Sequence, residues 1–219
     1  MHSEGADYFG LAWSALEWLE QTVQPGMTTI ETGAGASSVV FAAGGAKHTV
    51  ISPAPDEHVR IRAWCDELGV STDQLTFVAE SSDTALTAGG WQPEPLDLAL
   101  IDGAHLFPFP AVDWFYTAKH LKVGGIMVLD DAYLPSVAMV SRFLRISDSW
   151  EYQGPISYRT VWFRKLDDEI GTDSVGARFD RFPRYGYLPL PQRAAAYARH
   201  VLIDRAPPVQ RALARLRRR

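Results

Sequence analysis

The chain has 219 residues, of which 47% are hydrophobic, and a net charge of −5 at pH 7. This length and composition suit one globular core rather than two domains. The apolar runs are far shorter than the roughly 18 residues that a membrane span needs, and no basic segment followed by an apolar stretch marks a secretory signal. One cysteine, Cys65, rules out an internal disulfide. We therefore expect a protein of the reducing cytoplasm.

Charge is distributed unevenly along the chain. Residues 167–219 hold eleven arginines and no lysine against six acids, a balance of about +5, whereas residues 1–166 carry about −10. An acidic main body argues against a nucleic-acid footprint there. We predict a main domain over 1–166 and an Arg-rich C-terminal extension over 167–219, made of a loop plus helices.

Strand and helix patterns alternate through the main domain. They predict helices over 10–24, 37–43, 56–68, 83–88, 111–121 and 135–146, and strands over 28–31, 48–51, 75–79, 96–101, 126–129, 151–158 and 160–165. Five strand–helix alternations before a closing antiparallel pair predict an α/β fold, with a doubly wound, mostly parallel seven-stranded sheet and helices on both faces. The first helix is a candidate lid.

The run Glu31-Thr32-Gly33-Ala34-Gly35 turns from the first strand into a helix. Glycines there let the backbone pass close to a ligand, and the N–H groups that open the helix can hold a polar or anionic group. Ligands of such sheets bind outside the carboxyl ends of the strands. The unusual polar residues fall at those ends: Glu31, Ser52, Ser81, Asp102, Asp130 and Asp131. Alone, the glycine pair would often serve only packing.

Residues 25–166 resemble the class I S-adenosylmethionine-dependent methyltransferases. The glycine turn resembles the first motif of that family. Leu-Ala-Leu-Ile-Asp-Gly-Ala-His over 98–105 and Leu-Lys-Val-Gly-Gly-Ile-Met-Val-Leu-Asp-Asp over 121–131 resemble its fourth and fifth strands. Together these runs are most similar to the metal-assisted O-methyltransferases of the macrocin and novobiocin sugar type. The resemblance implies a Rossmann-like fold, S-adenosylmethionine as cofactor, and Mg²⁺ held by Asp102, Asp130 and Asp131.

The resemblance also implies the residues that contact the cofactor. They lie in the glycine turn and at the strand ends: Glu31, Gly33, Ala34, Gly35, Ser38, Ser52, Ser81, Ser82 and Asp102. Relatives usually place an acid after the second strand for the ribose and often another after the third, near the adenine, where this chain has Ser52-Pro53 and Ser81-Ser82. Glu57, Glu80 and Asp83 are candidates to replace these acids.

Charge physics supports a cation at the acidic cluster. Neighbouring strands lie about 4.8 Å apart, so the carboxylates at the ends of the fourth and fifth strands would crowd together. Such crowding is costly unless a cation joins them or one is protonated, and magnesium prefers oxygen ligands. The alternative is that Asp130 or Asp131 only caps the following turn.

His105 is the candidate general base, because an imidazole titrates near neutral pH. In novobiocin-type relatives the base is thought to be an acid at the position of Ala104, so the assignment to His105 departs from the family. The alternatives are that His105 orders its loop or contacts the cofactor.

We expect an enzyme that moves a methyl group from S-adenosylmethionine to a hydroxyl of a small polyhydroxylated or sugar-containing acceptor, with magnesium and a general base. Three alternatives stay open: a nucleic-acid methyltransferase that recruits its substrate through the Arg-rich tail, an NAD-dependent oxidoreductase, and a non-catalytic cofactor-binding module. The N-terminal helix and the C-terminal extension are candidate surfaces for a homo-oligomer.

Overall fold

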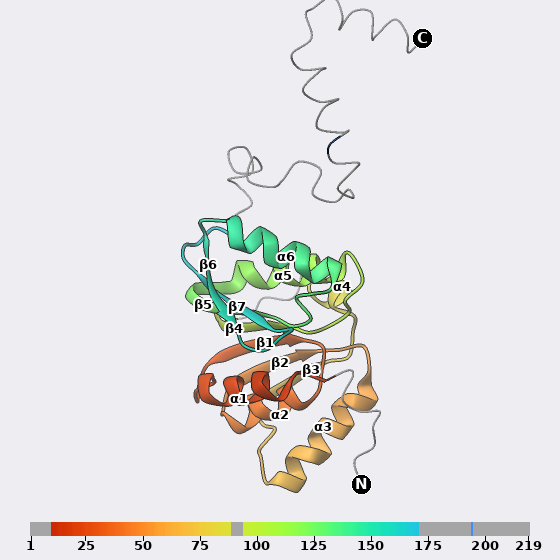
Figure 1. The fold of residues 1–219 in the computed structure, drawn as a ribbon. Coiled ribbons are helices and arrows are strands. Elements are labelled where there is room, and N and C mark those ends of the chain that lie inside the picture. The colour runs from red at the N-terminus through yellow and green to blue at the C-terminus, as the bar shows by residue number, and fades with distance from the viewer. Residues whose placement is uncertain (1–9, 89–93, 171–193, 195–219) are drawn as a thin grey trace, which may run out of the picture. The chain divides into compact units, whose positions relative to one another are not determined.

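The computed structural model describes residues 10–88, 94–170 and 194 (Figure 1). The chain divides into two compact units, Met1–Asp173 and Ser174–Arg219. The predictions for the Arg-rich extension lie outside the described residues, apart from 167–170 and 194. No helix of the described part is long and apolar enough to cross a membrane.

The first unit alternates helices and strands in the predicted order. They are α1 (Trp13–Thr22), β1 (Thr28–Thr32), α2 (Ala36–Ala43), β2 (Lys47–Ile51), α3 (Pro55–Leu68), β3 (Leu75–Val78), α4 (Ser82–Ala85), β4 (Leu96–Ile101), α5 (Phe109–His120), β5 (Leu121–Leu129), α6 (Pro135–Ile146), β6 (Trp150–Pro155) and β7 (Val161–Lys165).

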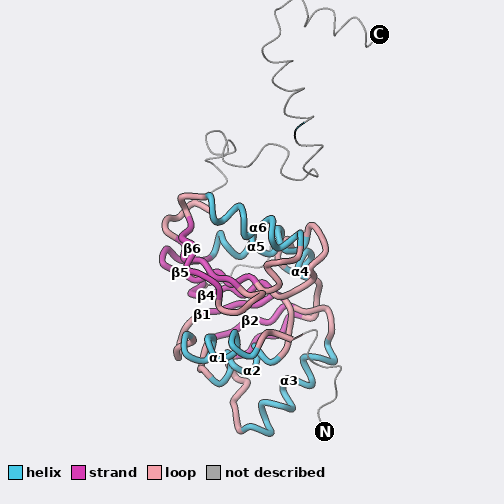
Figure 2. Tube along the Cα trace, viewed as in Figure 1, coloured by secondary structure: helices cyan, strands magenta, loops and turns pink. Residues whose placement is uncertain are grey.

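Seven strands form one sheet in the order β3-β2-β1-β4-β5-β7-β6. Strands β1 to β5 are parallel, and β7 runs antiparallel to both β5 and β6. Helices α1, α2 and α3 cover one face of the sheet, and α4, α5 and α6 cover the other (Figures 1 and 2). This confirms the predicted Rossmann-like, mostly parallel sheet with its antiparallel closing pair.

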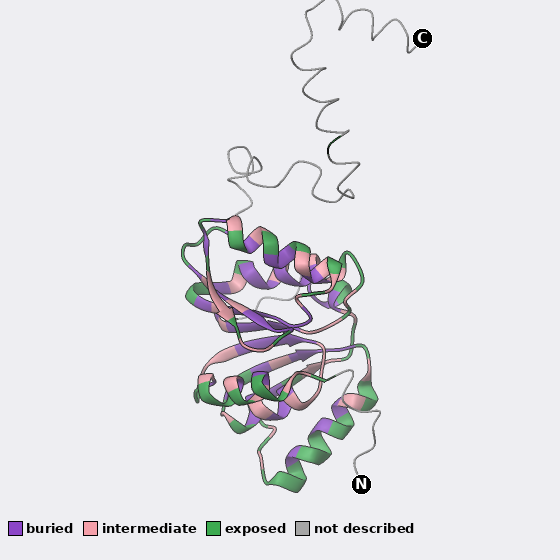
Figure 3. Cartoon of the chain, viewed as in Figure 1, coloured by how far each residue is buried: buried purple, intermediate pink, exposed green. Residues whose placement is uncertain are grey.

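The strand pleat explains why both faces are apolar, since successive side chains point to opposite faces. In β4, Leu98 and Leu100 pack on the face that also holds Leu19 and Phe41. Ala99 and Ile101 pack on the other face, with the α5 and α6 side chains. The buried strands therefore form the middle layer of the first unit (Figure 3).

The fifth strand differs from its prediction. It begins at Leu121 rather than Ile126, so the Gly124-Gly125 pair lies inside it, beside an irregularity in the pairing with β4. Gly124 has φ +82°, a conformation that glycine adopts readily. The glycines therefore accommodate a bulge instead of opening the strand.

Candidate functional site

The carboxyl ends of the five parallel strands are aligned by hydrogen bonds that continue the sheet past the strands. The backbone N–H of Ser52 donates to Val78, that of Gly33 to Ile51, that of Asp102 to Thr32 and that of Asp130 to Ile101, at 2.9–3.1 Å. Strand order reverses between β1 and β4, which opens the crevice in which such sheets bind ligands. The predicted polar residues therefore lie along one edge of the sheet.

Gly33 is required by a close approach of two loops. Its φ is +97°, and a Cβ atom on it would lie 2.3 Å from the carbonyl oxygen of Asp102. Gly35 differs, because its Cβ would meet no described heavy atom within 4 Å. The first glycine brings the turn against the β4 loop, and the second leaves open space beside the turn.

Glu31 is buried and bonded inside the protein. Its carboxylate accepts hydrogen bonds from Ser37 Oγ at 2.6 Å and from Ser38 Oγ, and His48 Nε2 lies 3.2 Å from Oε1. The other ring nitrogen of His48 is 2.8 Å from Thr29 Oγ1. The structure thus places Glu31 and Ser38, both predicted to contact the cofactor, in a buried network that joins β1, β2 and α2.

Glu57 reaches the end of β2 from the first turn of α3. Ser52 Oγ donates to Glu57 Oε2 at 3.1 Å, and the Glu57 side chain is 40% exposed. A pocket of about 300 Å³ opens between the glycine turn and α3, lined by Ala34, Gly35, Glu57, Arg60, Ile61 and Trp64. Among the three acids considered as replacements for the missing ribose acid, the structure brings Glu57 to Ser52 and the glycine turn.

The two serines after β3 have different surroundings. Ser81 donates to the Asp83 carboxylate at the surface, whereas Ser82 is buried. Near Ser82 lies Asp113 of α5, which is fully buried. Burial raises the pKa of Asp113 to about 6, and the nearby Ser82 and Thr32 hydroxyls partly offset that rise. Asp113 thus favours its protonated form more than an exposed aspartate does.

His105 and two carboxylates converge at the ends of β4 and β5. His105 Nε2 lies 3.2 Å from Asp131 Oδ2 and 3.9 Å from Asp102 Oδ1. Asp131 has φ 50°, an uncommon conformation for a residue other than glycine. Burial raises the pKa of Asp102 well above its ordinary value; the neighbouring carboxylates add to this rise and Arg159 partly opposes it. An imidazole held this way can accept a proton and remain charge-compensated.

Arg159 is the cation of this cluster, and sequence reasoning missed it. Its Nε and Nη2 atoms donate to Asp130 Oδ2 at 3.0 and 2.6 Å, and Nε lies 3.1 Å from Asp131 Oδ1. Burial lowers the pKa of Arg159, but the hydrogen bonds to Asp130 and the two carboxylate charges outweigh this and raise it above its ordinary value. A topological signal was present: Arg159 lies two residues before the start of β7, which begins beside the end of β5.

The predicted magnesium site does not fit these residues as they are placed. Asp130 is completely buried, with Oδ2 taken by Arg159 and Oδ1 accepting from Thr160 Oγ1 at 2.5 Å. Among the described residues, no group of three His, Cys, Asp or Glu side chains is arranged to hold a metal ion. A guanidinium, rather than open carboxylate oxygens, faces the cluster.

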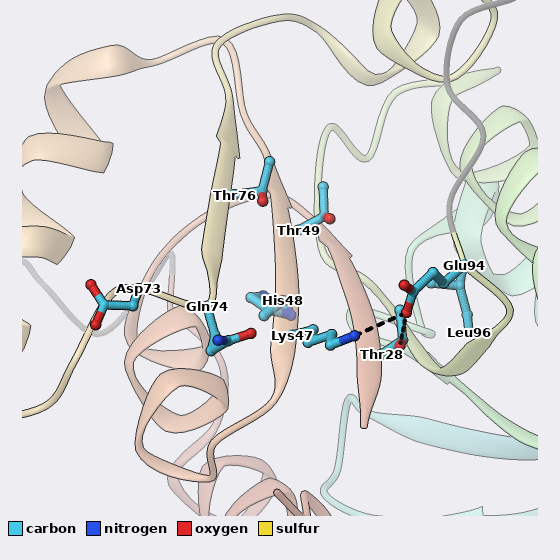
Figure 4. Close-up of a pocket in the computed structure, with 9 residues that line it drawn as sticks. All are labelled: Thr28, Lys47, His48, Thr49, Asp73, Gln74, Thr76, Glu94 and Leu96. Carbon is cyan, nitrogen blue, oxygen red and sulfur yellow. Dashed lines mark hydrogen bonds and ion pairs between the residues drawn. The ribbon is translucent and has the colours of Figure 1, made fainter. Parts of the chain in front are cut away.

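Two further pockets lie at opposite ends of the strands. A pocket of about 390 Å³ opens beside His105, lined by His105, Leu106, Phe107, Pro135, Ser136 and Met139. Another, of about 240 Å³, lies at the opposite, amino end of the strands and is bounded by the exposed pair Lys47 and Glu94, 3.3 Å apart (Figure 4). The first adjoins the candidate base, whereas the second lies at the wrong edge of the sheet for this chemistry.

The model of a family described as "Methyltransferase domain" matches residues 30–132, just under half of the chain. No curated protein matches the chain by sequence. Many solved structures share the fold, and three are representative. The O-methyltransferase TomG from Streptomyces achromogenes, solved with S-adenosylmethionine, is 16% identical over 73% of this chain and 82% of its own, with a TM-score of 0.58.

An O-methyltransferase from Bacillus cereus, solved with S-adenosylhomocysteine, is 13% identical over 73% of this chain and 84% of its own, with a TM-score of 0.60. An rRNA methylase from Streptococcus thermophilus is 13% identical over 70% of this chain and 95% of its own, with a TM-score of 0.53. These likenesses establish the fold. Together, the family match and the fold support a class I S-adenosylmethionine-dependent methyltransferase.

Proposed function

We propose that the chain is an O-methyltransferase that transfers a methyl group from S-adenosylmethionine to a hydroxyl of a small acceptor. One observation carries the proposal. Nε2 of His105 faces the carboxylates of Asp131 and Asp102, at the same sheet edge as the glycine turn, where a sulfonium methyl and an acceptor oxygen would meet. Placement of a base, cofactor turn and pocket at one edge is what this reaction requires.

The cofactor supplies an electrophilic methyl group on a sulfonium, and transfer breaks its C–S bond as a C–O bond forms. The protein has to hold the acceptor hydroxyl in line and receive its proton. His105 takes that proton, and Asp131 at 3.2 Å stabilises the imidazolium that results. The electron pair of the broken bond would stay on sulfur, so the transfer needs no oxidant or reductant.

For the cofactor we propose Gly33, Ala34 and Gly35 beneath the methionine portion and Glu57 for the ribose hydroxyls. Glu57 is exposed enough to accept hydrogen bonds, and Ser52 orients one of its oxygens. The open space beside Gly35 and the adjoining pocket leave room for the ligand. Glu31 supports the cofactor site indirectly, because it holds the helix that follows the turn.

For the acceptor we propose a hydroxylated ring compound, either a sugar or a phenol. The pocket beside His105 is walled mainly by apolar side chains, with Leu106 and Phe107 well exposed. Such walls suit the flat apolar face of a ring, while a hydroxyl on its edge meets the base.

Calorimetric titration of the protein with S-adenosylmethionine, and separately with NAD, tests the cofactor assignment. We expect saturable binding of S-adenosylmethionine and none of NAD; the reverse would indicate an oxidoreductase, and silence towards both would indicate a non-catalytic module. Radiolabelled methyl transfer to a panel of sugars, phenols and total RNA then tests the acceptor. Label in RNA alone would favour the rRNA methylase type of activity.

A further inference from the structure

The cation at the acidic cluster belongs to the protein itself. The Arg159 side chain is buried beside the two acids that follow β5, with its Nε shared between Asp130 at 3.0 Å and Asp131 at 3.1 Å. Its Nη2 also donates to the carbonyl oxygen of Gly10 at 2.8 Å. Contacts on three sides fix the guanidinium in one position.

Both oxygens of Asp130 accept hydrogen bonds inside the protein. A carboxylate that ligates a divalent cation must direct a lone pair at it, but here Oδ2 accepts two bonds from Arg159 and Oδ1 accepts one from Thr160. The residue is 0% exposed. A metal could use Asp130 Oδ2 only after Arg159 had left a buried ion pair joined by two hydrogen bonds, which is costly.

The Arg159 contacts also reach the candidate base. Arg159 Nε lies beside Oδ1 of Asp131, and the other oxygen of the same carboxylate lies beside His105 Nε2. Arg159 therefore fixes the orientation of Asp131, and Asp131 fixes the imidazole. In this chain of contacts Arg159 acts through Asp131, as a positioning residue that touches no reacting atom.

We infer that the Arg159 guanidinium takes the place of a divalent cation at the ends of β4 and β5, so that this site needs no metal. The single positive charge of Arg159 reduces the repulsion among carboxylates whose crowding would otherwise favour a metal. The structural part of this inference depends on the contacts alone, and only its catalytic part rests on the proposed methyl transfer.

Thermal melting of the full chain in EDTA and in rising Mg²⁺ or Mn²⁺ tests the structural part without cofactor or acceptor. We expect no saturable shift for the wild type. A bound cation would raise the melting temperature by roughly 3–6 °C for each tenfold excess over its dissociation constant. Such a rise in the wild type at up to millimolar metal, abolished by Asp102→Asn, would overturn the inference.

The variant Arg159→Met tests whether loss of the guanidinium creates a response to metal. Without the guanidinium the three carboxylates lack a counter-charge, so we expect this variant to melt lower and to regain several degrees on addition of Mg²⁺. The matched control is Arg164→Met, on the same hairpin but bonded to the Gly124 carbonyl at the surface, which should stay indifferent to metal. A folded Arg159→Met protein that is equally indifferent contradicts the inference.

Arg159→Lys covers the case in which Arg159→Met does not fold. Lysine keeps the positive charge but loses the fork that joins the two carboxylates, so we expect a folded, metal-indifferent protein; a saturable metal response from it would count against the inference. Once an acceptor is known, turnover should be unchanged by EDTA, and Arg159→Lys should lower kcat more than it alters KM. Absence of any turnover alongside the expected melting results would refute the proposed function only.

Discussion

Nε2 of His105 lies 3.2 Å from Oδ2 of Asp131, a residue held at φ 50°. The backbone conformation of Asp131 is one that L-residues other than glycine, asparagine and aspartate seldom adopt. Aspartate can adopt it, and the surrounding contacts fix Asp131 there. Asp131 thereby joins the His105 imidazole to the buried Arg159 guanidinium.

His105→Ala removes the proposed base. We expect kcat/KM for methyl transfer to fall by about 10²–10⁴, because the acceptor hydroxyl then has no positioned group to receive its proton. Steady-state kinetics with the identified acceptor measure this loss. Calorimetry provides the control, since the affinity for S-adenosylmethionine should change less than threefold. Unaltered turnover would leave His105 as a loop-ordering residue.

Gly33→Ala forces a Cβ against the Asp102 carbonyl at a positive φ. We expect a loss of about 2–4 kcal/mol of unfolding free energy, from overpacking together with backbone strain. Chemical denaturation measures it. Gly35→Ala is the matched control, since its Cβ would meet no described atom; its stability should change by under about 1 kcal/mol, while its cofactor affinity falls. Equal destabilisation by the two substitutions would contradict this account.

Glu57→Gln tests the proposed ribose contact. Removal of the negative charge weakens hydrogen bonds donated by the two ribose hydroxyls, and a charge-assisted bond is worth about 1.5–3 kcal/mol. We therefore expect S-adenosylmethionine and S-adenosylhomocysteine to bind roughly 10- to 100-fold more weakly by calorimetry. Glu67→Gln, an exposed acid on the same helix, should bind both normally. Matching affinities for the two variants would remove Glu57 from the cofactor site.

Asp113 predicts a pH dependence of stability. Its pKa is about 6 in the folded chain, against about 3.9 unfolded, so the folded state binds the proton more tightly. The resulting stabilisation is complete below pH 4 and is lost as pH rises through 6, amounting to about 3 kcal/mol. Relative to the wild type, Asp113→Asn should therefore gain stability between pH 4.5 and 7.5. Denaturant unfolding of the wild type and of Asp113→Asn at pH 4.5 and at pH 7.5 measures this change. A difference in unfolding free energy that is the same at both pH values would contradict it.

Periodicity and turn residues predicted the order of the helices and strands and most of their bounds, because each has a distinct local pattern. Strand β4 and helix α6 match their predicted ranges. The start of β5 was missed because the Gly124-Gly125 pair usually interrupts a strand, whereas here pairing with β4 and β7 carries the strand through a bulge. Tertiary pairing overrode the local signal.

Within the site, sequence order predicted which residues reach the same sheet edge but not which partners they bond. Glu31 follows the motif, yet its oxygens are occupied by Ser37 and Ser38. Arg159 stands 29 residues after Asp130 in the chain, and only the antiparallel return of β7 brings the two together. Such long-range pairs have no local signal and depend on strand order.

The close approach of Gly33 to the Asp102 carbonyl has a consequence for ligand affinity. We expect a cofactor bound at the glycine turn to restrain the loop that carries Asp102 and His105, so that the affinities for cofactor and acceptor are coupled. Such coupling is reciprocal, and each ligand should therefore change the dissociation constant of the other by the same factor.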